Sequence, residues 1–318
     1  MKKLFLFAAL TAAFSLTSCS DDDDMTAVSS NSVDTDAKAI VFTVNDGDAL
    51  TRSGDVTSLS SMKVTGVTTT GDETYFSNET FSLASGVFSS ATPYYWPSSG
   101  SMDFYATNTG TISYASGTAT MSITGTDGTT DYVAACSKNT LKQSSIALSF
   151  KHIMSRVGVK VKPADSSDGY DYVITGITLS AIGSGKYTFP AITGGVGTWS
   201  DQKDYKTYSW STGLPATTGS SNSGKVITLS EAYYLIPSST NLTFDVEYKV
   251  YKNGVLLYDC TGDDCGSIDI SASSLAAGKS VYFVLEPIFS SSGLSKIAFT
   301  SSVTAWGTAT DLSDDYEV

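Results

Sequence analysis

The sequence has few of the residues on which most catalytic and metal sites depend. Its 318 residues include one histidine and four cysteines. A serine–histidine–aspartate relay needs an accessible histidine, whereas His152 lies inside an apolar run, where a core role is expected. A zinc site needs four nitrogen or sulfur ligands, which Cys136 and His152 do not supply. We therefore predict no catalytic centre, no metal and no cofactor.

Acidic residues are plentiful, but they form no recognisable site. Nearly all of them lie in loops or at turns, where a solvated carboxylate is the usual role, and counting them identifies no glycosidase pair. The acidic loops 45–48 and 127–131 lack the spacing and the closing glutamate of an EF-hand, so we expect no calcium site in either. An enzyme is the least favoured class.

Basic residues are scarce. The formal net charge is −13, which argues against nucleic acid as a partner, because phosphate binding needs clustered lysine and arginine. Arginine occurs twice, as Arg52 and Arg156, and Arg156 falls in an apolar stretch that we expect to be buried. An arginine-specific protease acting on the folded chain would therefore have one good site, after Arg52.

The N-terminus has the form of a secretory signal. Lys2 and Lys3 precede an apolar core that is too short to span a bilayer, so residues 1–18 are predicted to be a signal peptide. The small residues before Cys19 resemble a bacterial lipobox, in which the cysteine is lipidated and holds the protein to the outer membrane. Ordinary secretion, with Cys19 left as a thiol, is the alternative.

Residues 19–38 are predicted to be a flexible leash. Four aspartates, residues 21–24, cannot pack together, and no periodicity follows them. This acidic run also resembles the surface-export signal of Bacteroidales lipoproteins, which would place the protein at the cell surface. A plain periplasmic tether is the alternative.

The first predicted strand covers residues 39–44. Ile40, Phe42 and Val44 alternate on one face, and turn residues follow directly. Arg52 and Ser53 lie in the loop after the strand. Our hypothesis is that cleavage between them makes the strand removable and switches the protein on.

The rest of the chain predicts an all-β fold of many short antiparallel strands. The spacing is typical of two tandem β-sandwiches, which we place at residues 39–163 and 164–318. The strongest hairpin signal runs from Leu242 to Leu257 around Asn253-Gly254. In the run 146–161 the apolar residues change from even to odd positions, which predicts a bulge or helical turn near His152.

Two further expectations concern glycine-rich stretches in the second half. Gly183-Ser184-Gly185 is predicted to be a turn, and residues 194–222 to form long surface loops carrying Trp199 and Trp210. Exposed tryptophans could stack on sugar rings, which leaves a surface glycan-binding lipoprotein as the alternative function. A tryptophan beside alternating apolar residues is more often part of the core.

Cys260 and Cys265 flank a four-residue segment. In an oxidising compartment this spacing allows a disulfide that closes a small loop, and two free thiols are the alternative.

Several short motifs together resemble the fimbrillin-like family, the type V pilus subunit lipoproteins of Bacteroidales. The motifs are Thr51-Arg52 after the first strand, Tyr94-Tyr95-Trp96-Pro97, Phe104-Tyr105-Ala106, Leu148-Ser149-Phe150-Lys151-His152, Val157-Gly158-Val159, Tyr234-Leu235-Ile236-Pro237, Leu275-Ala276-Ala277-Gly278-Lys279 and Val303-Thr304-Ala305-Trp306. The resemblance covers most of the chain after the signal peptide.

This resemblance implies transthyretin-like, Greek-key sandwiches and a role as a fimbrial subunit in adhesion to a host or glycan ligand. It also implies that an arginine-specific protease cuts after Arg52 and removes the strand of Ile40, Phe42 and Val44. A C-terminal donor strand from another subunit would then fill the vacated groove. In this chain the donor strand would contain Ile297, Phe299, Val303 and Trp306.

Overall fold

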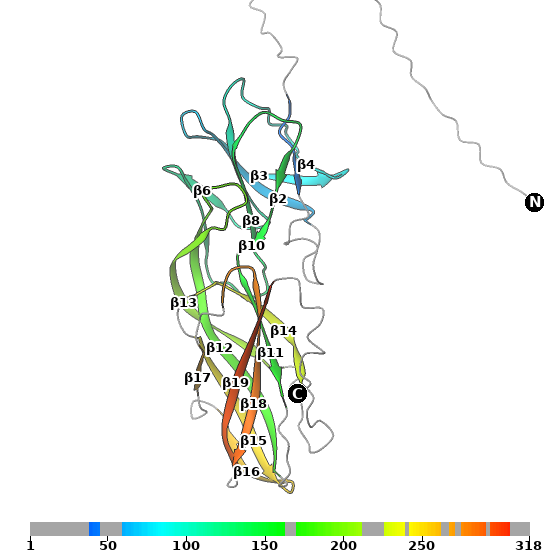
Figure 1. The fold of residues 1–318 in the computed structure, drawn as a ribbon, viewed down its shortest axis with the longest axis vertical. Coiled ribbons are helices and arrows are strands. Elements are labelled where there is room, and N and C mark those ends of the chain that lie inside the picture. The colour runs from blue at the N-terminus through cyan, green and yellow to red at the C-terminus, as the bar shows by residue number, and fades with distance from the viewer. Residues whose placement is uncertain are drawn as a thin grey trace, which may run out of the picture. The chain divides into compact units, whose positions relative to one another are not determined.

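The structure is a computed structural model that describes residues 38–44, 59–162, 170–211, 226–238, 242–261, 267–270, 275–290 and 293–305. All regular elements among these residues are β-strands (Figure 1). The prediction of an all-β fold is confirmed. In the described part of the chain no helix is long and apolar enough to cross a membrane.

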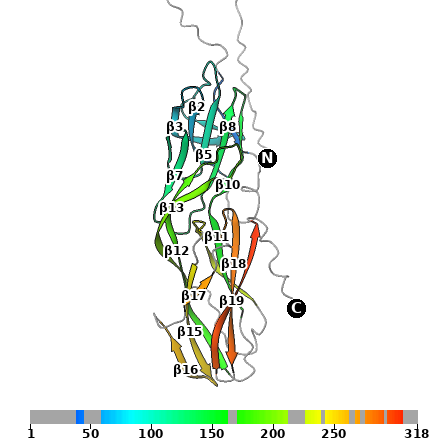
Figure 2. The same cartoon turned by 60° about the vertical axis from the view of Figure 1, so that its left-hand side comes forward.

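The first sheet contains eight strands within the described residues, in the order β10-β8-β5-β2-β3-β4-β1-β9. Strands β2, β5 and β8 lie side by side in it, as Figure 2 shows. The bounds are β1 Phe42–Val44, β2 Ser61–Thr68, β3 Glu73–Ala84, β4 Val87–Ser90, β5 Met102–Thr107, β8 Val133–Thr140, β9 Ile146–Leu148 and β10 Lys151–His152.

A second sheet follows the order β16-β15-β12-β7-β6, with β13 paired to β12 and β17 paired to β15. The bounds are β6 Ile112–Ala115, β7 Thr118–Ile123, β12 Tyr170–Thr188, β13 Thr198–Trp210, β15 Leu242–Lys252, β16 Val255–Cys260 and β17 Ser267–Ile270. The predicted hairpin is confirmed as β15 and β16. Asn253 and Gly254 both have positive φ, as a tight hairpin turn requires.

A third sheet has the order β14-β11-β18-β19. Its bounds are β11 Ser155–Val161, β14 Ile227–Leu235, β18 Lys279–Ser290 and β19 Gly293–Ala305. β11 pairs parallel with β18 and antiparallel with β14. β19 pairs antiparallel with β18 and is the terminal strand of this order.

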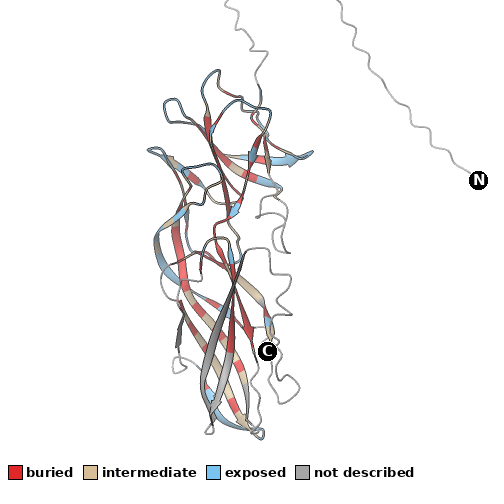
Figure 3. Ribbon diagram, viewed as in Figure 1, coloured by how far each residue is buried: buried red, intermediate tan, exposed pale blue. Residues whose placement is uncertain are grey.

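Buried hydrophobic side chains form three clusters. Figure 3 marks the buried residues in red along the strands. One cluster belongs to the first sheet and includes Phe42 and Phe104. A second includes Trp210 and Phe244. The third joins residues from both sides of position 163, because β7 pairs antiparallel with β12. The division into two tandem sandwiches at residues 163 and 164 stays a prediction, and that boundary lies outside the described residues.

The parity change in the run 146–161 has a different cause from the one predicted. The chain forms β9 and β10 in the first sheet and then β11 in the third sheet. Ile153 and Met154, between β10 and β11, are buried. The apolar positions shift because the chain passes from strands of the first sheet to a strand of the third sheet. No bulge or helical turn near His152 is needed to keep the side chains buried.

The turn expected at Gly183-Ser184-Gly185 is wrong, because β12 continues through it. A Cβ atom on Gly183 would lie 2.7 Å from the main-chain oxygen of Asp204 in β13. Glycine is therefore present because a neighbouring backbone approaches closely, a second role of glycine inside strands. The loops expected over residues 194–222 are wrong in part, since β13 occupies residues 198–210.

Candidate functional site

The N-terminal segment, residues 38–44, is built into the interior of the first sheet. β1 pairs antiparallel with β4, with Phe42 opposite Phe88. On its other side it pairs parallel with β9, with Phe42 opposite Ile146. Because β9 ends the strand order among the described residues, β1 is its sole ladder partner there. The segment thus holds β9 onto the sheet.

The start of the segment pairs with the aromatic stretch 94–96. The Ile40 amide donates to the Tyr94 carbonyl oxygen at 2.7 Å, and the Trp96 amide donates to the Lys38 carbonyl oxygen at 3.1 Å. Ala39 forms an isolated antiparallel bridge with Tyr95. The Pro93 and Pro97 that flank this stretch keep it out of a regular ladder, as expected from the sequence. Its partner is a feature that the sequence did not reveal.

The side chains of the segment fill the first core from one face. Ile40 is 1% exposed and Phe42 is 0% exposed, whereas Val44 is half-buried. The Phe42 ring meets Phe81 and Phe104 edge to face, with ring centroids 4.9 and 5.3 Å away. Such contacts favour burial beyond the area alone. The predicted alternation of Ile40, Phe42 and Val44 therefore matches the observed inward face.

The aromatic stretch also carries a tyrosine, Tyr94, whose pKa is shifted. Partial burial raises the pKa of the Tyr94 phenol, and the hydrogen bond and negative charge of Glu79 raise it further. Tyr75 donates its hydroxyl to the Tyr95 carbonyl oxygen at 2.9 Å. These contacts hold the stretch in place beside the segment without any group poised for proton transfer.

The arrangement is suited to exchanging one strand for another. Without residues 38–44, β4 and β9 would face each other across a gap lined by apolar side chains. The unpaired main-chain groups along such a gap accept a replacement strand, and pockets for alternate side chains select it.

The other predicted site residues lie apart from this segment or outside the described residues. Cys19, Arg52, Ser53, Cys265 and Trp306 are outside the described part of the chain. Ile297, Phe299 and Val303 lie in β19. Cys260 is buried at the end of β16, and its pairing with Cys265 stays a prediction.

The tryptophans give little support to sugar stacking. Trp96 and Trp210 are buried. Trp199 is half-buried, and its Nε1 donates to the Ile153 carbonyl oxygen at 2.9 Å. Among the described tryptophans Trp199 alone keeps part of its side chain accessible, and it is anchored by this hydrogen bond.

The single histidine belongs to a buried pair at the end of β10. His152 Nδ1 lies 2.6 Å from Asp131 Oδ2, and the two side chains are 3% and 12% exposed. The prediction of a core histidine is confirmed. The described residues contain no cluster of three His, Cys, Asp or Glu residues able to hold a metal ion, and that includes the loop 127–131.

Replacing Asp131 with alanine should lower the free energy of unfolding by about 1–3 kcal/mol, because the buried imidazole loses a hydrogen-bond partner. Asp131→Asn is the matched control, since its amide oxygen still accepts a bond from Nδ1–H. Urea unfolding of both variants measures the difference. A loss for Asp131→Asn as large as that for Asp131→Ala would contradict this account.

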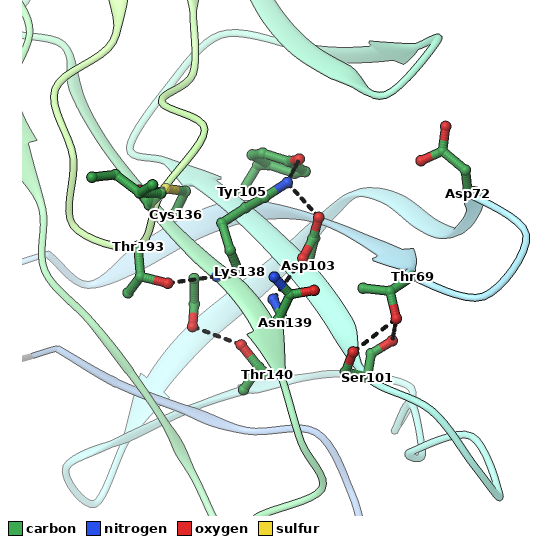
Figure 4. Close-up of polar contacts among 12 residues, drawn as sticks. Thr69, Asp72, Ser101, Asp103, Tyr105, Cys136, Lys138, Asn139, Thr140 and Thr193 are labelled. Atoms are coloured by element: carbon green, nitrogen blue, oxygen red, sulfur yellow. Dashed lines mark hydrogen bonds and ion pairs between the residues drawn. The ribbon is translucent and has the colours of Figure 1, made fainter.

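A second polar cluster braces β5 against β8 (Figure 4). Lys138 Nζ donates to Asp103 Oδ2 and to the Tyr105 hydroxyl. The main-chain amide of Asn139 donates to Asp103 Oδ1 at 2.7 Å. Desolvation lowers the pKa of Lys138, but the bonds to Asp103 and Tyr105 outweigh it and raise the pKa. A lysine held charged and paired is a structural brace and not a nucleophile.

These features define an all-β protein in which an N-terminal strand completes the core of the first sheet. A family model described as Fimbrillin-like matches residues 41–306, so the chain belongs to the fimbrillin-like family. The match begins within the N-terminal segment and ends just after β19. The family is one of structural adhesion proteins, and the chain is therefore not an enzyme.

Solved structures share this fold at low sequence identity. A fimbrial protein from Bacteroides vulgatus is 15% identical, with a TM-score of 0.57, over 85% of this chain and 99% of that one. Two proteins from Parabacteroides distasonis with a proposed role in cell adhesion are each 9% identical. Their TM-scores are 0.55 and 0.51, over 85% of this chain and 97% and 98% of theirs. A search of curated proteins gave no match.

Proposed function

We propose that the chain is the precursor of a fimbrial subunit, a structural or tip component used in adhesion. Lipid on Cys19 would anchor the precursor in the outer membrane at the cell surface. An arginine-specific protease would cut between Arg52 and Ser53 and release residues 38–44, which we call the placeholder strand. A C-terminal strand of another fimbrial subunit then takes its place.

The observation that carries this proposal is the position of the placeholder strand. It lies between β4 and β9, with Ile40 and Phe42 buried, yet in the sequence it adjoins the predicted leash and precedes Arg52 by a short stretch. Family membership and the fold shared with the fimbrial protein from Bacteroides vulgatus support the assembly role.

Removal of the placeholder strand would leave the subunit unstable until the groove is refilled. A fully buried isoleucine or phenylalanine contributes about 1.5–3 kcal/mol by burial alone. The main-chain bonds to β4, β9 and the stretch 94–96 would be lost as well. A strand with suitable alternate apolar residues restores both the side-chain burial and the main-chain hydrogen bonds, and this gain in free energy drives assembly.

The test is limited digestion of the non-lipidated precursor, residues 20–318, with an arginine-specific protease. We expect a product that begins at Ser53 and forms oligomers on size-exclusion chromatography with light scattering. Arg52→Ala should stay uncut and monomeric. Arg156→Lys, which removes the other arginine, should be cut and oligomerise like the unmodified chain.

A product that begins at Ser53, keeps its whole C-terminus and stays monomeric after prolonged incubation would overturn the proposal. N-terminal sequencing and intact mass distinguish this outcome from incomplete cutting or loss of the C-terminus.

A further inference from the structure

A four-residue pattern occurs in both the placeholder strand and β19. Ile40-Val41-Phe42-Thr43 and Ile297-Ala298-Phe299-Thr300 share Ile, Phe and Thr at the same spacing and in the same chain direction. None of the other phenylalanines in the sequence has isoleucine two residues before it, and none is followed by threonine. The pattern therefore marks these two segments alone.

Two of the three matching positions are the most deeply buried ones of the segment. Ile40 and Phe42 are the segment's fully buried side chains, and the Phe42 ring is fixed by Phe81 and Phe104. Val41, where β19 has alanine, is half-buried. So is Val44, where β19 has Ser301, and a half-buried position tolerates a smaller residue. The two segments agree at both fully buried positions and at the half-buried Thr43, and they differ at the half-buried Val41 and Val44.

β19 can leave its sheet by breaking its main-chain hydrogen bonds to one strand, β18. It is the terminal strand of the third sheet and pairs with β18 from Lys279 opposite Ala305 to Ser290 opposite Gly293. Pairing along a whole strand of the same subunit also keeps β19 occupied before assembly. Its release exposes one edge of β18 and leaves β11 and β14 paired.

We infer that β19 of one subunit enters the vacated groove of another in the direction and register of the placeholder strand, with Phe299 at the position of Phe42. This inference rests on the proposed function and adds the direction and register of the incoming strand. The donor strand then runs parallel to β9 and antiparallel to β4. Phe299 lies opposite Phe88 and Ile146, and Thr300 lies opposite Ala147.

Chemical cross-linking between cysteines tests the register. In the precursor Thr43 is the partner of Ala147 across β1 and β9, and Ala147 is exposed. One population of cut subunits carries Ala147→Cys and another carries Thr300→Cys, and a short bifunctional maleimide joins thiols that lie close together. We expect an intersubunit product, identified by mass spectrometry, whose yield exceeds that of either single variant at least fivefold.

Two matched variants report the alternatives. Residue 298 would face Ala147 if the strand were reversed with Phe299 in the same pocket, or if it slipped so that Ile297 took the place of Phe42, so Ala298→Cys reports both alternatives. Ser302→Cys reports a slip of two residues that puts Ser301 at the position of Phe42. Higher yield from either variant than from Thr300→Cys would overturn the inference. The uncut chain with Thr43→Cys and Ala147→Cys should cross-link within one subunit and calibrates the reaction.

Exchanging the two buried residues of the donor strand gives a second, independent test. The double variant I297F/F299I keeps the total side-chain volume but puts each residue at the other's position, and it should reduce oligomer yield at least tenfold. Ala298→Val, which makes the shared pattern identical to the placeholder strand, should keep the yield of the unmodified chain. Equal yields from I297F/F299I and the unmodified chain would overturn the inference. Thermal unfolding of each uncut variant confirms that the chain folds.

The two proposals fail in distinguishable ways. If the unmodified cut product stays monomeric, the proposed function fails. If that product oligomerises but Thr300→Cys gives no preferred cross-link to Ala147→Cys, assembly stands and the register is wrong.

Discussion

Replacing Phe42 with alanine in the uncut chain should lower the free energy of unfolding by about 3–5 kcal/mol, the usual cost of truncating a fully buried phenylalanine. The side chain is 0% exposed and is held edge to face by Phe81 and Phe104. Because β4 and β9 flank its strand on both sides, the surrounding structure has little freedom to close the cavity. Guanidinium unfolding followed by circular dichroism measures the loss.

Val44→Ala is the matched control for Phe42→Ala. Val44 points to the same face but is half-buried, so we expect a loss of about 1 kcal/mol. A loss for Phe42→Ala no larger than that for Val44→Ala would contradict the burial of the placeholder strand. In the oligomer formed from the cut chain, Phe42→Ala should leave stability unchanged, because the strand is no longer part of the subunit.

The face of the placeholder strand could be predicted from the sequence, but its neighbours could not. Ile40, Phe42 and Val44 alternate with smaller or more polar residues, and a period of two defines one inward face. Parallel pairing with Ile146–Leu148 has no local signal, because β9 is short and lies about a hundred residues away along the chain. Long-range pairing of this kind is decided by tertiary packing.

The glycine positions were predicted with mixed success, again because tertiary packing decides some of them. Asn253-Gly254 marks a real hairpin turn, since both residues have the positive φ that the turn requires. Gly183 lies within β12, where it makes room for the Asp204 carbonyl of β13. A single sequence does not separate these two uses of glycine, because the second depends on which strand lies beside the glycine in the folded protein.

Trp210 shows how a polar context conceals a core residue. Most residues of β13 are exposed or half-buried, and Asp201 and Asp204 have positive φ. Polar residues suited to these positions give the segment a composition that resembles a loop. At its C-terminal end the strand turns Tyr208 and Trp210 inward, with Trp210 opposite Ile177 of β12. Burial here follows from pairing with the long apolar strand β12, which supplies the core that β13 covers.

Replacing Trp210 with alanine should lower the free energy of unfolding by about 3–5 kcal/mol. The side chain is 0% exposed, its Nε1 donates to the Glu231 carbonyl oxygen at 2.8 Å, and its ring packs against Tyr233 and Phe244. Truncation removes these contacts and leaves the Glu231 carbonyl oxygen without that donor.

Tyr205→Ala is the control for Trp210→Ala, because Tyr205 is an aromatic residue of the same strand and is 62% exposed. Its loss should be within about 0.5 kcal/mol of zero, as is usual for surface substitutions. Urea unfolding of both variants measures the contrast. Equal losses would mean that Trp210 is accessible, which would return it to the residues able to stack on a sugar. The expected contrast instead assigns Trp210 to the core and removes it from the residues able to stack on a sugar.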